Sequence, residues 1–160
     1  ILYATSSGFL FGWAKPVPVD PRKYRDPVAG DIRVSLAGIV SNLILAVLAT
    51  AMAAVVFRFG GTGAEQGAVA SALSQMAMYG ILINLILAFF NLIPIPPLDG
   101  SHVLFHMLPR KLALRYREAG RYGILVVMAL LFLFPGAFRV LMYPVTLLMG
   151  VADRVIRLWL

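Results

Sequence analysis

The chain has 160 residues, a length typical of one domain, and 61% of them are hydrophobic. Soluble globular proteins are about 45–50% apolar, so this composition and the mean hydropathy of +0.87 exclude a water-soluble fold. The net charge of +7 comes from two basic clusters between apolar runs, as membrane topology produces, and we expect no nucleic-acid binding. Cysteine is absent, which excludes disulfides and thiolate metal ligands.

Residues 1–33 are expected to form a re-entrant or extended segment followed by a basic loop. The first 13 residues are apolar but fewer than the roughly 20 that a helix needs to cross a bilayer, so we expect either the end of a longer span or a re-entrant piece. Prolines within residues 15–21 exclude a helix there, and extended backbone leaves groups that a substrate strand can pair with. An ordinary interfacial loop is the alternative. The candidate substrate-binding residues are Lys15, Pro16, Val17, Pro18 and Val19.

Two long apolar runs predict membrane-spanning helices at residues 34–57 and 70–93, joined by a glycine-rich connector. Asp31 is the expected N-cap of the first helix. Asn42 on that helix needs a partner, either in a structural hydrogen bond between helices or near an active site. Small residues recur along this helix and allow close helix approach in lipid: Ala37, Gly38, Ser41, Ala46, Ala49 and Ala53.

The second run ends in Asn91-Leu-Ile-Pro-Ile-Pro-Pro-Leu-Asp-Gly100, where the prolines stop the helix. Asp99 is surrounded by apolar sequence, and an ionisable residue at membrane depth indicates a functional site. Asn84 and Asn91 lie seven residues apart on one helical face, which predicts a polar cavity lining. The alternative role for Asp99 is the N-cap of a short helix within residues 94–108.

His102 and His106 follow Asp99 at spacings that place all three side chains on one helical face. Such a face is itself a candidate metal site. Alternatively, both histidines are hydrogen-bonded or solvated near the membrane interface. No Glu lies between them, so they do not form the His-Glu-x-x-His signature of metalloprotease helices.

Residues 122–151 are apolar and interrupted by Pro135-Gly136, which predicts one kinked span or two short membrane helices. Residues 152–160 are amphipathic and suit the membrane interface. The sequence therefore predicts a single all-α integral membrane domain over residues 1–160. It is a polytopic helical bundle with a short extended or re-entrant Pro-rich segment and a Pro-broken helix carrying Asp99.

The distribution of basic residues predicts the orientation of this domain. Residues 58–69 carry one basic residue, whereas residues 14–33 and 109–121 carry five each. Because basic loops remain cytoplasmic, we expect both loops on the cytoplasmic side. Asp99 is then near the cytoplasmic end of the second span, where water can reach it.

The stretch NLIPIPPLDG resembles the Asn-x-x-Pro-x-Pro-x-x-Asp-Gly motif of the site-2 protease family, the intramembrane zinc metallopeptidases. Residues 11–19 resemble a segment of many bacterial members, and residues 36–42 resemble the family's Ala-Gly-Pro-x-x-Asn pattern, with Ile39 in place of Pro. The resemblance covers about residues 8 to 110. It implies a multi-pass protein of a bacterial cytoplasmic (inner) membrane.

The resemblance also implies zinc as cofactor, Asp99 as its third protein ligand, and Asn91 as a hydrogen-bond donor to the substrate backbone or the oxyanion. The partner substrate would be a membrane-anchored protein. The first two ligands would come from an upstream His-Glu-x-x-His helix, which this sequence lacks. We expect that the preceding segment is missing and that the chain alone is inactive. A pseudo-protease is the alternative.

A non-enzymatic interpretation also fits the residues. A membrane scaffold or transport-like protein would use the broken helix and Asp99 to line a polar path. A His-Glu-x-x-His sequence on an apolar helix upstream would favour the protease.

Overall fold

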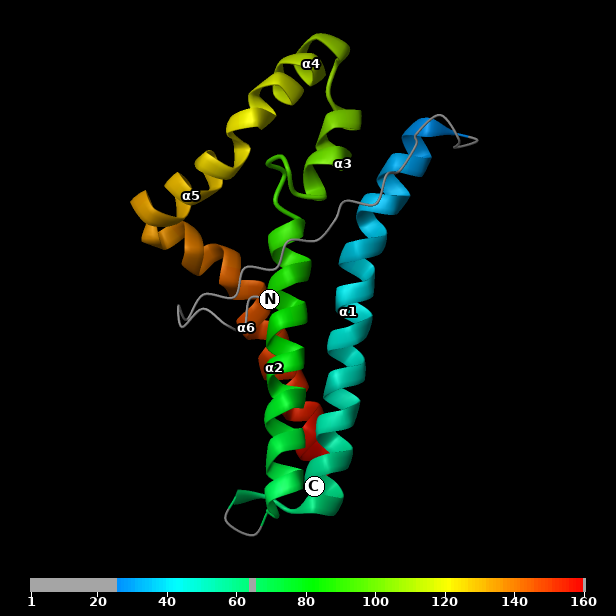
Figure 1. Cartoon of the computed structure of the whole chain (residues 1–160), viewed down its shortest axis with the longest axis vertical. Helices are drawn as coiled ribbons and strands as arrows, with labels where there is room; N and C mark the ends of the chain where they lie inside the picture. Colours follow the sequence, from blue (N-terminus) through cyan, green and yellow to red (C-terminus); the bar gives the residue numbers. More distant parts are fainter. Residues whose placement is uncertain (1–25, 64–65, 160) are drawn as a thin grey trace, which may run out of the picture.

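The computed structural model describes residues 26–63 and 66–159, so the candidate substrate strand, residues 15–19, lies outside the described residues. The described residues form helices and no strand, which confirms the predicted all-α membrane fold (Figure 1). The elements are α1 (Pro27–Gly60), α2 (Ala68–Asn91), α3 (Gly100–Met107), α4 (Arg110–Ala119), the 3₁₀ turn η4 (Gly120–Tyr122), α5 (Gly123–Leu133) and α6 (Pro135–Leu158).

Helix α1 begins earlier than the apolar run indicated. Asp26 is its N-cap, and one carboxylate oxygen accepts hydrogen bonds from the backbone N–H groups of Val28 (3.0 Å) and Ala29 (3.1 Å). Pro27 occupies the first helical turn, where its fixed φ favours the helix and its missing N–H costs nothing. The prediction of Asp31 as N-cap was therefore wrong: Asp31 lies in the second turn of α1.

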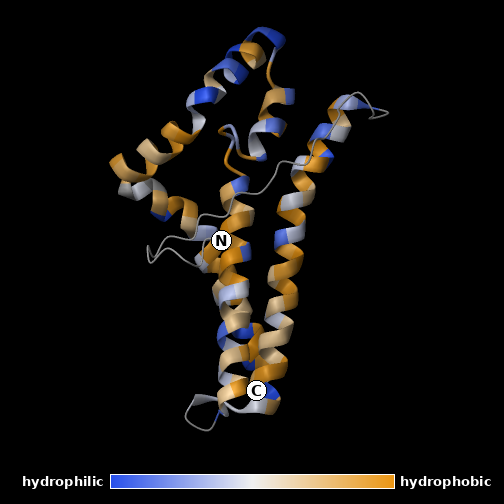
Figure 2. Ribbon diagram, viewed as in Figure 1, coloured by the Kyte–Doolittle hydropathy of each residue, from blue (hydrophilic) through white to orange (hydrophobic). Residues whose placement is uncertain are grey.

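Helices α1 and α2 form a long antiparallel hairpin, and both are long and apolar enough to cross a membrane. Their outward faces are rich in exposed apolar side chains, as a lipid environment requires (Figure 2). Ala53 and Ala77 are fully buried between them, and a Cβ atom at Gly80 would lie 3.3 Å from the Cβ of Ala49. This half of the predicted small-residue stripe does bring the helices close together.

Helices α5 and α6 meet at a sharp bend: the direction of the chain changes by 86° between Arg110–Leu133 and Phe138–Leu158. Helix α6 then returns along the hairpin and contacts both α1 and α2. Val145 and Ile156 of α6 are buried in one cluster with Ile81 and Leu85 of α2. Residues 152–158 of the expected amphipathic tail form the last turns of α6, with Ala152 and Ile156 buried in this core.

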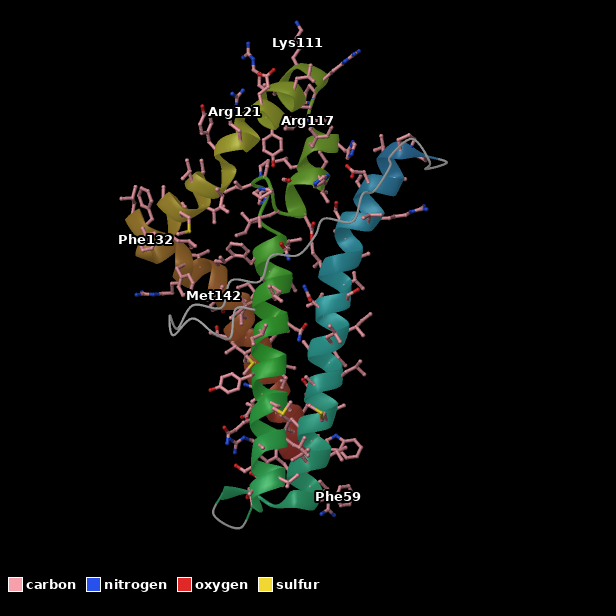
Figure 3. The ribbon with its side chains drawn as sticks, in the orientation of Figure 1. Phe59, Lys111, Arg117, Arg121, Phe132 and Met142 are labelled. Atoms are coloured by element: carbon pink, nitrogen blue, oxygen red, sulfur yellow. The ribbon has the colours of Figure 1, made fainter. Side chains whose placement is uncertain are left out.

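The two ends of the hairpin differ in character. The N-terminal end of α1, helix α3 and helix α4 gather at one end, and the connector between α1 and α2 lies at the other (Figure 1). Lys111, Arg117 and Arg121 mark the basic end, and Phe59 marks the opposite end (Figure 3). The proline-rich turn between α2 and α3 is thus at the same end as the basic cluster.

Candidate functional site

The motif turn begins where α2 ends, at Asn91. The N–H of Leu92 still donates to the carbonyl oxygen of Ala88 (3.2 Å), and the N–H of Ile93 donates to Phe90 (3.1 Å). Beyond this point prolines have no N–H to continue the ladder, so the helix stops. The next hydrogen bonds are local turns, from the N–H of Leu98 to Ile95 (3.0 Å) among them. Irregular backbone therefore carries the chain from Asn91 to Gly100.

Gly100 brings this turn back onto the end of α2. A Cβ atom at this position would collide with the carbonyl oxygens of Leu92 and Ile93, so only glycine fits without displacing the backbone. Helix α3 consequently starts directly beside the end of α2. Asp99, the residue before Gly100, is held at the junction of the two helices.

The carboxylate of Asp99 is directed towards α1. Asp99 holds the N-cap position of α3, but its side chain makes no capping hydrogen bond, so a capping role does not account for it. A Cβ atom at Gly38 would lie 3.3 Å from Oδ2 of Asp99, so the carboxylate packs against α1 at a position that has no side chain. Burial raises the pKa of Asp99, and the nearby His102 opposes this rise.

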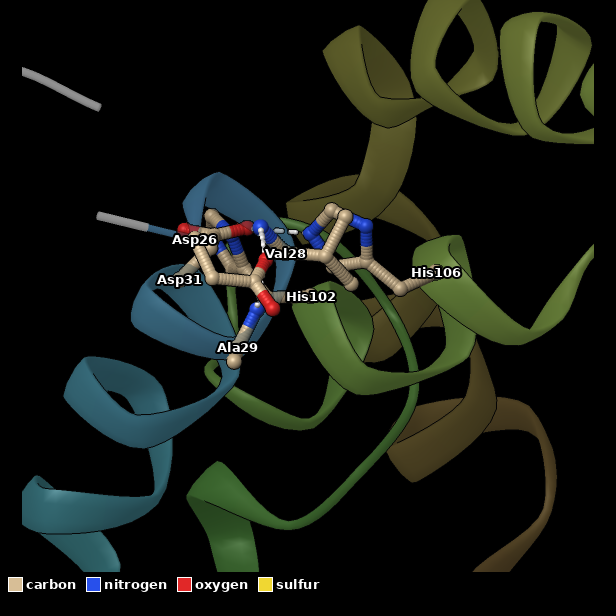
Figure 4. Close-up of polar contacts among 6 residues, drawn as sticks. All are labelled: Asp26, Val28, Ala29, Asp31, His102 and His106. Atoms are coloured by element: carbon tan, nitrogen blue, oxygen red, sulfur yellow. Dashed lines mark hydrogen bonds and ion pairs between the residues drawn. The ribbon is translucent and has the colours of Figure 1, made fainter. Parts of the chain in front are cut away.

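The two histidines of α3 bind a different carboxylate. Nδ1 of His102 lies 3.1 Å from Oδ2 of Asp31, and Nε2 of His106 lies 2.8 Å from the same oxygen (Figure 4). This confirms the hydrogen-bonded interpretation of both histidines. The described part of the chain contains no group of three His, Cys, Asp or Glu residues placed to hold a metal, so the rival metal face of Asp99, His102 and His106 does not form.

The contact of Asp31 with the two histidines was not predicted from the sequence. Asp31 is separated from His102 by 71 positions and from His106 by 75. No local pattern links an acid in one helix to histidines that far away. Its acidic character alone suggested a helix cap.

The three asparagines behave differently from one another. The Asn84 amide donates to the carbonyl oxygen of Gly80 within α2 (2.8 Å), so it is satisfied by its own helix rather than by a polar cavity. Asn91 is half-buried at the last residue of α2, and Asn42 is half-buried one turn beyond Gly38 in α1. Neither Asn91 nor Asn42 has a side-chain hydrogen bond with another described residue.

A cavity of about 340 Å³ opens between α1, α3 and α4, and most of its surface is apolar. Asp31, His102, His106, Tyr116 and Arg117 contribute its polar lining. A larger cavity, about 630 Å³, lies between α1, α2 and α6 and is lined almost entirely by apolar side chains. Neither Asp99 nor Asn91 lines either cavity, so the candidate site is located by the contact of Asp99 with Gly38, at the junction of α2 and α3.

Comparisons with known proteins show what the chain is similar to. Residues 61–134, which include the whole motif turn, match the family model described as Peptidase family M50. The chain is 36% identical over 120 residues to a Bacillus subtilis (strain 168) protein named "Putative zinc metalloprotease YwhC". That alignment covers 75% of this chain and 54% of the relative, so the chain spans about half the length of the relative. No solved structure matches the chain.

Proposed function

We propose that this chain, which belongs to peptidase family M50, the site-2 proteases, forms part of an intramembrane zinc metalloprotease. The reaction would be hydrolysis of a peptide bond in a membrane-anchored protein. The observation that carries the proposal is the position of the Asp99 carboxylate: it stands on irregular backbone, without a capping bond, against Gly38. Irregular backbone at membrane depth is tolerated only where it is buried in protein or lines a water-filled cavity.

The carboxylate of Asp99 can serve as one of the protein ligands of zinc. Zinc accepts carboxylate oxygens, and catalytic sites use three protein ligands together with water. His102 and His106 are turned to Asp31 and do not complete such a set with Asp99. In this proposal two histidines and a glutamate come from a His-Glu-x-x-His helix of the full-length protein. Bound zinc would lower the pKa of a water and polarise the scissile carbonyl.

Asn91 is proposed to bind the substrate. It ends α2, eight residues before Asp99, and its half-buried amide has no partner in the described ranges, 26–63 and 66–159. An amide N–H held in a partly buried site can donate to the substrate backbone or to the developing oxyanion, and it pays little reorganisation in doing so. Residues 15–19, outside the described ranges, remain candidates for pairing with an extended substrate strand.

The proposed orientation follows from the basic cluster. Arg110, Lys111, Arg115 and Arg117 lie on α4, at the same end of the hairpin as Asp99 (Figure 3). Because such clusters stay on the cytoplasmic side, the site would open near the inner surface of a bacterial cytoplasmic membrane. Water needed for hydrolysis would then reach it without crossing the bilayer.

The decisive experiment is zinc analysis of the full-length protein. Asp99→Asn keeps the shape of the side chain but replaces the charged oxygen by a neutral, weaker ligand, so we expect zinc affinity and substrate cleavage to fall sharply. Asp153→Asn is the matched control, since Asp153 pairs with Arg157 on the exposed side of α6 (2.8 Å). Unchanged zinc binding in Asp99→Asn would refute the assignment and favour a scaffold or transport-like protein.

A further inference from the structure

Two hydrogen bonds between α1 and α3 share a single acceptor oxygen atom. Oδ2 of Asp31 contacts Nδ1 of His102 at 3.1 Å and Nε2 of His106 at 2.8 Å (Figure 4). The His106 side chain is 17% exposed, and that of His102 is 49% exposed. The cluster is therefore partly shielded from water, which strengthens its hydrogen bonds relative to fully exposed ones.

The chemistry of the three groups fixes the direction of these bonds. An ionised carboxylate only accepts hydrogen bonds, so both contacting ring nitrogens must be donors. This selects the Nδ1–H form of His102 and the Nε2–H form of His106 where the rings are neutral.

The bridge also fixes the helix that carries the rings. Helix α3 has eight residues, and helices this short do not hold together in isolation, so tertiary contacts must set its orientation. One bond would allow α3 to pivot about the contact. Two bonds from residues one turn apart prevent rotation of α3 about its own axis as well as its separation from α1.

We propose that Asp31 is a positioning residue that acts through His102 and His106 to hold Asp99 in place. Asp99 directly precedes α3, so any rotation of α3 moves its carboxylate away from Gly38. Asp31 and Gly38 lie seven residues apart on α1, hence on the same face. Helix α1 thus anchors α3 at one point and receives the carboxylate two turns later. This inference rests on the proposed role of Asp99 as a zinc ligand.

The test compares Asp31→Ala with Asp26→Ala in the full-length protein. Both variants remove a carboxylate near the start of α1, but the hydrogen bonds of Asp26 are the capping bonds to Val28 and Ala29 of its own helix. Zinc affinity is measured by competition with a chelator, and the melting temperature is measured without metal. Loss of a supporting residue typically weakens metal binding about 10- to 100-fold, and we expect at least the lower figure for Asp31→Ala. Asp26→Ala should lower only the melting temperature.

A second variant keeps the inference testable if Asp31→Ala does not fold. His102→Ala combined with His106→Ala removes the same bridge from its other side and should weaken zinc binding by a similar factor. Adding Asp31→Ala to that pair should then change little, because the interaction is already lost. Full zinc affinity in a folded variant of either kind, or simple additivity of the two, would overturn the positioning role.

Asp99→Ala, measured in parallel, separates the two proposals. If it leaves zinc binding unchanged, the proposed function fails. If it abolishes tight binding while Asp31→Ala and Asp26→Ala give the same affinity, only the positioning role of Asp31 fails.

Discussion

Gly38→Ala should stabilise α1 and weaken the metal site at the same time. The added Cβ atom would lie 3.3 Å from Oδ2 of Asp99, closer than ordinary van der Waals contact. The carboxylate must therefore move by a few tenths of an ångström. Metal–ligand distances are defined to within about 0.2 Å, so a shift of this size strains the bond. We expect zinc affinity to fall about tenfold, which corresponds to about 1.4 kcal/mol.

The effect of the same substitution on folding has the opposite sign. Alanine is more favourable than glycine inside a helix by about 0.8–1.0 kcal/mol, because glycine loses more backbone entropy. The free energy of unfolding of metal-free Gly38→Ala should rise or stay unchanged. A weaker metal site in a protein that is no less stable cannot be explained by general misfolding.

Gly80→Ala provides a matched control on α2. Its Cβ atom would also lie 3.3 Å from its nearest neighbour, but that neighbour is the Cβ of Ala49. Zinc affinity by chelator competition and thermal unfolding of the metal-free full-length protein should be measured for both variants. If Gly38→Ala and Gly80→Ala bind zinc equally tightly, the contact between Asp99 and α1 does not support the metal site.

Two further predictions concern topology and substrate binding. Single cysteines at Arg22 and Arg117 should be labelled from the cytoplasmic side and a cysteine at Gly63 from the other; labelling of all three from one side contradicts the orientation. Asn91→Ala should lower the turnover of the full-length enzyme roughly 10²–10³-fold while zinc content is retained, because the amide is proposed to act on the substrate. Unchanged turnover, or loss of zinc, would count against this role.

The sequence predicted the helices better than it predicted their partners. Hydropathy revealed both long helices because crossing a bilayer requires a long apolar run whatever the tertiary structure is. Prolines located the break after Asn91 for an equally local reason. The predicted start of α1 was too late because the apolar run begins after the helix does. The helix starts at Asp26-Pro27, a strong helix-start pair in polar sequence. Hydropathy and prolines thus predicted the features that depend on one segment of the chain alone.

The contacts of the candidate site depend on segments that are far apart in the chain. Asp31 meets His102 and His106 only after α1 and α2 have packed as a hairpin, and the contact of Asp99 with Gly38 has the same requirement. Spacing placed Asp99 and both histidines on one helical face, but it did not indicate that this face meets α1 or which α1 residue each side chain contacts. That choice is made by tertiary packing.

The segment that carries the basic cluster after α3 also contacts the motif turn. Prolines in the motif turn cannot donate hydrogen bonds, so the turn must be held through its carbonyl oxygens and its surface. The Tyr116 hydroxyl donates to the carbonyl oxygen of Pro94 (2.9 Å), and Gly123 packs so closely on the carbonyl of Pro96 that a side chain there would collide with it. Helix α1 therefore faces the Asp99 carboxylate from one side while residues 116–123 hold the prolines from the other. The segment whose basic residues predict the orientation in the membrane therefore also contacts the motif turn.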